Sequence, residues 1–166
     1  MADYKDPENT LLIETSKGPV VIEMRPDLAP NHVAHIKKLA REGAYDGVVF
    51  HRVIDGFMAQ TGDVQHGKGA DTSRAGTGGS SYPDLKAEFN AEPHTRGVVS
   101  MARAQNPNSA NSQFFIVFDD ARFLDRQYTV WGKVIEGMEN VDLIKRGEPV
   151  RDPDRMISVK VAADAA

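Results

Sequence analysis

Short runs rich in Val, Ile and aromatic residues recur along the chain, each bounded by Gly, Pro, Asn or Asp, and such runs predict β-strands. They lie at 11–13, 20–22, 48–54, 57–60, 98–102, 114–118, 129–134 and 156–161. Two stretches, 30–42 and 138–145, instead carry apolar residues at helical spacing. Because about seven or eight strands outnumber two helices and do not alternate with them, a parallel doubly wound sheet is disfavoured. We expect a mainly β fold, a closed antiparallel barrel with helical caps.

Length, charge and cysteine content narrow the class of protein. The 166 residues fit one domain, 1–166, with an ordered core over about 10–161. A net charge of -4 and a pI near 5.7 argue against nucleic acid or a membrane surface as partner. The absence of cysteine excludes disulfides, thiolate metal sites and cysteine nucleophiles. With no secretory signal, no apolar run of about 20 residues and no exposed apolar stripe, we expect a cytoplasmic monomer.

Three patterns associated with other chemistries are incomplete. The glycine-rich stretch 76–79 lacks the Gly-Lys-Ser/Thr ending of a phosphate loop. His32 and His35 share a face of the predicted helix, but we interpret them as surface histidines rather than as a metal site. Ser100 and Ser112 lack the Gly-x-Ser-x-Gly elbow of many serine hydrolases, so we expect them to satisfy backbone groups.

Arg52 is the residue that points to a site. On the predicted strand 48–54 it shares a face with Phe50 and Ile54. A charged group on an apolar face is costly unless it has a partner or a task. The alternative is an ordinary ion pair on the outside of the barrel.

The stretch around Gln113 repeats the same mixture of polar and aromatic residues. By the two-residue period of a strand, Gln113 and Phe115 share one face, and Phe114 and Ile116 share the other. One face therefore belongs to the core and the other presents an amide beside an aromatic ring, although Gln113 alone is also compatible with an exposed polar position. With Arg52, these residues suit an apolar pocket for an uncharged substrate whose reaction needs one positive hydrogen-bond donor.

Six blocks, in order along the chain, resemble the cyclophilins, the peptidyl-prolyl cis-trans isomerases. They are Phe50-His51-Arg52-Val53-Ile54, Gly56-Phe57-Met58-Ala59-Gln60, Gly76-Thr77-Gly78-Gly79, Ser100-Met101-Ala102, Asn111-Ser112-Gln113-Phe114-Phe115-Ile116 and Phe123-Leu124-Asp125. The resemblance covers about residues 10–161. It implies a closed eight-stranded antiparallel β-barrel capped by two α-helices, with the active groove on the outer surface. It also implies isomerisation of Xaa-Pro bonds in proline-containing peptides and protein segments, which assists protein folding and needs no metal or cofactor.

The resemblance also implies roles for individual residues. Arg52 is then the catalytic arginine. Four apolar side chains would line the proline pocket: Phe57, Met58, Phe115 and Leu124. Two amides would bind the peptide backbone or hold Arg52: Gln60 and Gln113. Three positions would border the residues that precede proline: Gly76, Ala102 and Arg103.

Three residues depart from the common pattern of the family. Phe123 stands where many members have Trp, and the loss of the indole N–H predicts weakened affinity for cyclosporin-type ligands. Tyr128 stands where His is frequent and keeps an aromatic wall. Arg103 replaces the usual Asn, which adds a cation near the groove and favours acidic residues before proline. A proline-binding module or chaperone without catalysis, which would not require Arg52, and a carrier barrel with a large lumen are the competing hypotheses.

Overall fold

The computed structural model describes residues 4–165. The elements in chain order are η1 (Pro7–Asn9), β1 (Thr10–Thr15), β2 (Gly18–Met24), α1 (Pro30–Arg41), β3 (Val48–Val49), β4 (Arg52–Ile54), β5 (Met58–Thr61), β6 (Val98–Met101), β7 (Phe114–Val117), η2 (Arg122–Leu124), β8 (Val130–Glu136), α2 (Met138–Val141), β9 (Arg155–Val161) and η3 (Ala162–Ala165). The opening hairpin and the first helix are confirmed. The second helix is shorter than predicted, because Leu143 and Ile144 donate to carbonyls only three residues back and close the helix as tight turns.

The strands form one antiparallel sheet, in the order β3-β9-β1-β2-β8-β6-β7-β5-β4. The mainly β class with two helices is confirmed, but the closed eight-stranded barrel is wrong. Over residues 4–165 the sheet has nine strands and is an open, curled half-barrel with β3 and β4 at its two edges. Within residues 4–165 no ladder joins these two edge strands.

The open edges arise from a break in the run 48–54, which the sequence predicted as one strand. Phe50 donates its N–H to Asp154 O at 2.9 Å, and His51 O accepts the N–H of Val150 at 3.1 Å. These two residues therefore bond to the loop before β9 instead of to a strand. Upstream of them β3 pairs with β9, and downstream β4 pairs with β5.

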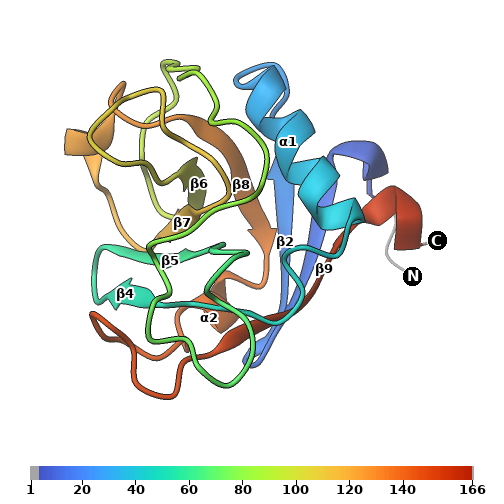
Figure 1. The fold of residues 1–166 in the computed structure, drawn as a ribbon. Coiled ribbons are helices and arrows are strands. Elements are labelled where there is room, and N and C mark those ends of the chain that lie inside the picture. The colour runs from blue at the N-terminus through green and yellow to red at the C-terminus, as the bar shows by residue number, and fades with distance from the viewer. Residues whose placement is uncertain (1–3, 166) are drawn as a thin grey trace.

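Helix α1 packs against β9 on one side of the curled sheet, whereas β4 to β7 lie on the opposite side (Figure 1). Its apolar stripe faces the sheet. Glu88, from the long segment between β5 and β6, accepts the N–H groups of Asn31 and His32 at the helix start. In the described part of the chain no helix has the length and apolar character needed to cross a membrane.

The prediction of surface histidines on α1 is wrong. His32 is completely buried and His35 is nearly so. The Nδ1 atom of His32 lies 2.6 Å from the Glu88 Oε1 atom, so a carboxylate distant in sequence accompanies the imidazole into the interior. Among residues 4–165 no group of three or more His, Cys, Asp or Glu side chains could hold a metal ion.

Buried side chains form two clusters on the two faces of the sheet. Along β7, Phe114 and Ile116 belong to the main core, and Phe115 and Val117 belong to a smaller cluster on the outer face, as the two-residue period predicted. Phe114 packs edge-on against Trp131, with ring centroids 5.4 Å apart, and both side chains are fully buried. Phe50 also lies in the main core, so the prediction that it shares the face of Arg52 is wrong.

Removing the Phe114 ring should destabilise the fold. We expect Phe114→Ala to lower the free energy of unfolding by about 3–5 kcal/mol, because the vacated space is enclosed. Phe115→Ala, the matched variant one residue along, should lower it less, because its ring borders an open hollow. Urea unfolding followed by circular dichroism measures both. An equal loss in the two variants would contradict the assignment of faces.

Candidate active site

The register of four neighbouring strands aligns residues that are far apart in sequence. Arg52 on β4 lies opposite Gln60 on β5, Gln60 lies opposite Phe115 on β7, and Phe115 lies opposite Ser100 on β6. Side chains of directly opposed residues project from the same face of a sheet. These four residues therefore form one cross-strand row on the outer face.

A chain of side-chain hydrogen bonds orients the polar end of this row. Gln113 donates from Nε2 to Gly78 O at 2.9 Å, and its Oε1 atom accepts from Gln60 Nε2, also at 2.9 Å. The Gln60 Oε1 atom in turn accepts from Arg52 Nη1 at 3.4 Å. Each amide is thus engaged at both its nitrogen and its oxygen.

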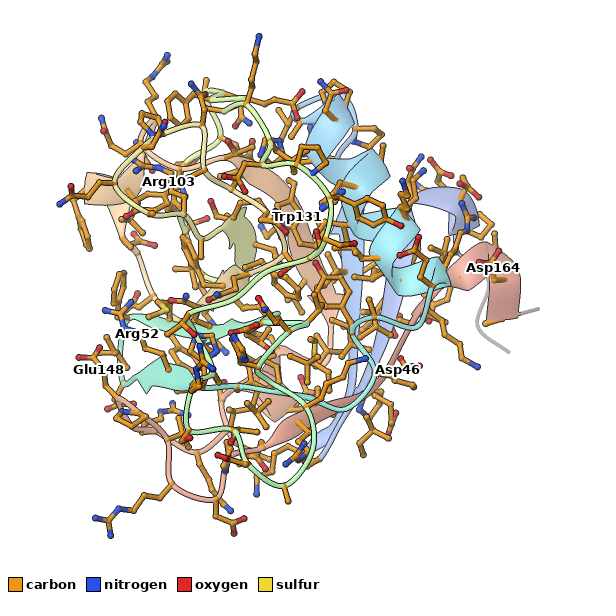
Figure 2. All side chains as sticks on the ribbon, viewed as in Figure 1. Asp46, Arg52, Arg103, Trp131, Glu148 and Asp164 are labelled. Carbon is orange, nitrogen blue, oxygen red and sulfur yellow. The ribbon has the colours of Figure 1, made fainter. Side chains whose placement is uncertain are left out.

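Glu148 holds the guanidinium of Arg52 from the other side. Arg52 Nε donates to Glu148 Oε2 at 2.7 Å, and the two side chains lie together in Figure 2. With Nε and Nη1 engaged, Nη2 of Arg52 makes no hydrogen bond within residues 4–165. The ion pair that the sequence left as an alternative is present, yet Arg52 also borders a hollow.

This hollow has a volume of about 450 Å³. We name it the first hollow. Predicted site residues line it: Arg52, Phe57, Met58, Gln60, Gly76, Ala102, Arg103, Phe115, Leu124 and Tyr128. Gln113 lines a second hollow of about 460 Å³, which shares several residues with the first. Phe123 lines neither hollow and is 73% exposed, with its ring centroid 5.6 Å from that of Phe57.

Sequence reasoning missed five residues that also line the first hollow: His51, Ala75, Thr77, Glu148 and Pro149. Glu148 lies 96 residues from its partner Arg52, and no local pattern indicates that pairing. The glycine at position 76 marks a close contact between its loop and the His51 ring. It has a φ of +101°, and a Cβ atom there would lie 3.0 Å from the His51 ring, so a side chain at this position would be strained and would crowd the imidazole.

The floor of the first hollow rests on a buried polar group. His94 stacks on Phe115 with ring centroids 6.2 Å apart; its Nε2 lies 3.0 Å from Ser100 Oγ and its Nδ1 lies 3.0 Å from Asp125 Oδ1. Ser100 thus bonds to a side chain rather than to the backbone groups that we predicted, whereas Ser112 donates to Gly62 O as predicted. Because the Ser100 hydroxyl is completely buried, this group supports Phe115 and is out of reach of a substrate.

Asp63, just after β5, organises the loop that borders both hollows. Its completely buried carboxylate accepts four backbone N–H groups, from Gln65, His66, Gly76 and Gly78, at 2.8–3.0 Å. Burial by itself would raise the pKa of Asp63, but these donors outweigh it and hold the pKa below the ordinary value. The charged carboxylate thereby fixes Gly76 at the rim.

Comparison with known proteins decides the family. The family model described as cyclophilin type peptidyl-prolyl cis-trans isomerase/CLD matches residues 10–162. The chain belongs to the cyclophilin family. Cyclophilins of this type are peptidyl-prolyl cis-trans isomerases, and that is the activity of this chain.

Individual cyclophilins agree with this assignment. A probable peptidyl-prolyl cis-trans isomerase of Brucella suis is 61% identical, over 98% of this chain and 87% of its own length. One from Synechococcus elongatus is 40% identical over 93% of this chain and 97% of its own length. The crystal structure of a cyclophilin from Hirschia baltica, 34% identical, matches with a TM-score of 0.85 and covers 97% of this chain and 76% of that one. A Cryptosporidium parvum cyclophilin, crystallised in the presence of the dipeptide Ala-Pro, is 26% identical with a TM-score of 0.80, over 92% of this chain and 98% of that one.

Asp63→Ala should loosen the loop at the rim. It leaves four backbone N–H groups without their buried, charged acceptor, so we expect a loss of about 2–4 kcal/mol in the free energy of unfolding. Hydrogen exchange measured by mass spectrometry should also quicken around Gly76 more than in β1. Unchanged protection there would contradict the role of Asp63, and Asp71→Ala, on an exposed carboxylate of the same segment, is the matched control.

Buried histidines should make the fold sensitive to mild acid. Burial lowers the pKa of His51 and of His94 below 6.5, although Asp63 and Asp125 oppose it, and His32 and His35 are shifted the same way. Below pH about 6.5 the unfolded chain therefore binds more protons than the folded one, and stability falls as pH falls, by up to about 1.4 kcal/mol per pH unit for each group. Urea unfolding at pH 7.5, 6.5 and 5.5 tests this, and equal free energies would refute it. His51→Asn should flatten the dependence.

Proposed function

We propose that Arg52 accelerates rotation about Xaa-Pro bonds by stabilising the twisted imide, without a covalent intermediate. One observation carries the proposal: the Arg52 guanidinium lines the same hollow as Phe57, Met58, Phe115 and Leu124 and keeps Nη2 available. A cation beside an apolar slot suits an uncharged ring whose neighbouring bond changes its charge distribution during reaction.

The electronic structure of the imide explains why one guanidinium suffices. The planar bond has partial double-bond character, and rotation has a barrier of about 20 kcal/mol. At the twisted state the proline nitrogen becomes pyramidal and gains a lone pair, and the carbonyl loses its conjugation. A donor aimed at that nitrogen or at the proline carbonyl binds the twisted state more tightly than either planar isomer. Lowering the barrier by about 7 kcal/mol gives about 10⁵-fold acceleration.

The remaining residues would bind and align the peptide. The proline ring would pack among the four apolar side chains, with Tyr128 as a wall at right angles to Phe115. Gln60 would bind the peptide backbone as well as hold Arg52. The residues before proline would pass Gly76, Ala102 and Arg103, where the first hollow meets the second. The cyclophilin crystallised with Ala-Pro supports proline-containing segments as substrates.

Other expectations from the sequence stay predictions. These are a single domain, a monomer, a cytoplasmic location, assistance to protein folding and no nucleic-acid or membrane partner. Weak cyclosporin binding is also a prediction. The exposed Phe123 ring beside Phe57 offers an apolar surface at the rim but no N–H donor.

Arg52→Ala should abolish most of the activity and leave the fold intact. The side chain is 42% exposed, so its removal opens no core cavity, and we expect kcat/KM to fall about 10²- to 10³-fold. Arg52→Lys keeps the charge but not the planar fork and should recover only part of the rate. Exchange NMR on short Xaa-Pro peptides measures the rates.

The same measurements separate catalysis from simple binding. Arg52→Ala should still bind the peptides, whereas Phe115→Ala should weaken binding and turnover together because it opens the pocket. Near-normal turnover by Arg52→Ala would exclude this mechanism, because the isomerase would then not need the arginine.

A further inference from the structure

Arg103 occupies the boundary between the two hollows. It is half-buried and lines both of them, as do Gln60, Gly76, Thr77 and Ala102. Figure 2 places Arg103 on the same side of the molecule as Arg52 and Glu148, away from α1. A peptide with its proline in the first hollow and its preceding residues in the second would pass this guanidinium.

Main-chain carbonyls hold Arg103 in place. Nε and Nη2 donate to Gln127 O at 3.1 and 2.7 Å, and Nη1 donates to Ala104 O at 2.9 Å and to Gln105 O at 3.2 Å. The guanidinium lies 4.6 Å from the centre of the Tyr128 ring. These contacts use four of the five N–H groups of an arginine side chain and leave one on Nη2. The cation is therefore fixed before any ligand arrives.

None of these partners carries a formal negative charge. Within residues 4–165 no carboxylate lies within 4.0 Å of the Arg103 guanidinium, whereas Arg25, Arg52 and Arg96 each have one. Two arginines and one glutamate give the first hollow a formal charge of +1, although the whole chain carries -4. The groove is thus locally positive on a negatively charged protein.

The carboxylate of Asp84 limits the positions that an acidic group of a ligand could occupy. Asp84 lines the second hollow and accepts from Asn111 Nδ2 at 3.0 Å, and it does not line the first hollow. A negatively charged side chain would be repelled near Asp84 and attracted at the boundary. The favourable position is therefore close to the proline rather than deep in the second hollow.

We propose that Arg103 is a specificity-determining residue that selects segments with Glu or Asp one or two positions before proline. The proposal rests on the proposed function, because it assumes that those positions pass the boundary. The substrate carboxylate would pair with the charge of Arg103 and accept its remaining N–H group. Lys at the same positions would be disfavoured.

A purely structural role for Arg103 makes a different prediction. Its carbonyl bonds tie the loop after β6 to Gln127, and loss of that tie would slow all substrates alike, whatever their charge. The ratio between an acidic and a neutral substrate therefore reports on selection, whereas the absolute rate does not.

The experiment compares peptides that carry Glu, Gln or Lys at either of the two positions before proline. Exchange NMR gives kcat/KM for wild type, Arg103→Gln and Arg103→Lys, with Arg126→Gln as control, since Arg126 is an exposed neighbouring cation that lines neither hollow. At low salt we expect wild type to prefer Glu over Gln by about two- to fivefold, as for an exposed ion pair. The preference should shrink as the salt concentration rises to about 0.5 M.

The variants then assign the preference to one side chain. Arg103→Gln should bring the Glu-to-Gln ratio to about one, even if every rate falls, and Arg126→Gln should keep the wild-type ratio. Arg103→Lys keeps a cation but loses most of the hydrogen bonds to the main-chain carbonyls, and it should keep part of the Glu-to-Gln ratio. If circular dichroism shows that Arg103→Gln does not fold, two other measurements decide. The proposal then requires that the kcat/KM of wild type falls in the order Glu, Gln, Lys. It also requires that Arg103→Lys keeps part of the Glu-to-Gln ratio.

Two results would overturn the selection by Arg103 without affecting the proposed function. One is a wild type that isomerises the Gln peptides but shows no preference for Glu. The other is a preference that persists in Arg103→Gln. If wild type isomerises none of the peptides, the proposed function fails, and the selection that rests on it fails with it.

Discussion

The register that β5 sets with its two neighbours determines the geometry of the groove. Because Gln60 lies opposite Arg52 on one side and Phe115 on the other, cation, amide and aromatic floor stand in one row across the sheet. A shift of one residue in either ladder would turn the arginine or the ring to the opposite face. The arrangement of these groove residues is therefore a property of strand pairing first and of side-chain contacts second.

Local periodicity predicted one part of this site, and the family resemblance predicted most of the rest. The alternation along 113–116 correctly separated Phe114 from Phe115, and the resemblance placed Arg52 and its apolar neighbours in one hollow. The break at Phe50 and His51 could not be predicted in the same way, because the groups that interrupt the strand belong to the loop before β9. The prediction of a closed barrel was wrong for that reason.

Partners distant in sequence explain the other differences. His32 is interior because Glu88 accompanies it, and Arg52 is held by Glu148. Glu88 and Asp63 place carboxylates against backbone N–H groups, at the start of α1 and in the loop beside the groove. Each pairing depends on tertiary structure, which a pattern of neighbouring residues does not encode. Spacing and the family resemblance therefore predicted residues that line the first hollow, but not the carboxylates that hold them in place.

The distribution of aromatic residues gives this cyclophilin a useful optical property. Trp131 is the single tryptophan of the chain and is fully buried against Phe114, in the cluster on the inner face of the sheet. The exposed aromatic ring beside the first hollow is Phe123, which has no indole. Intrinsic tryptophan fluorescence therefore comes from the interior alone, so it follows the packing of the core rather than the surface of the groove.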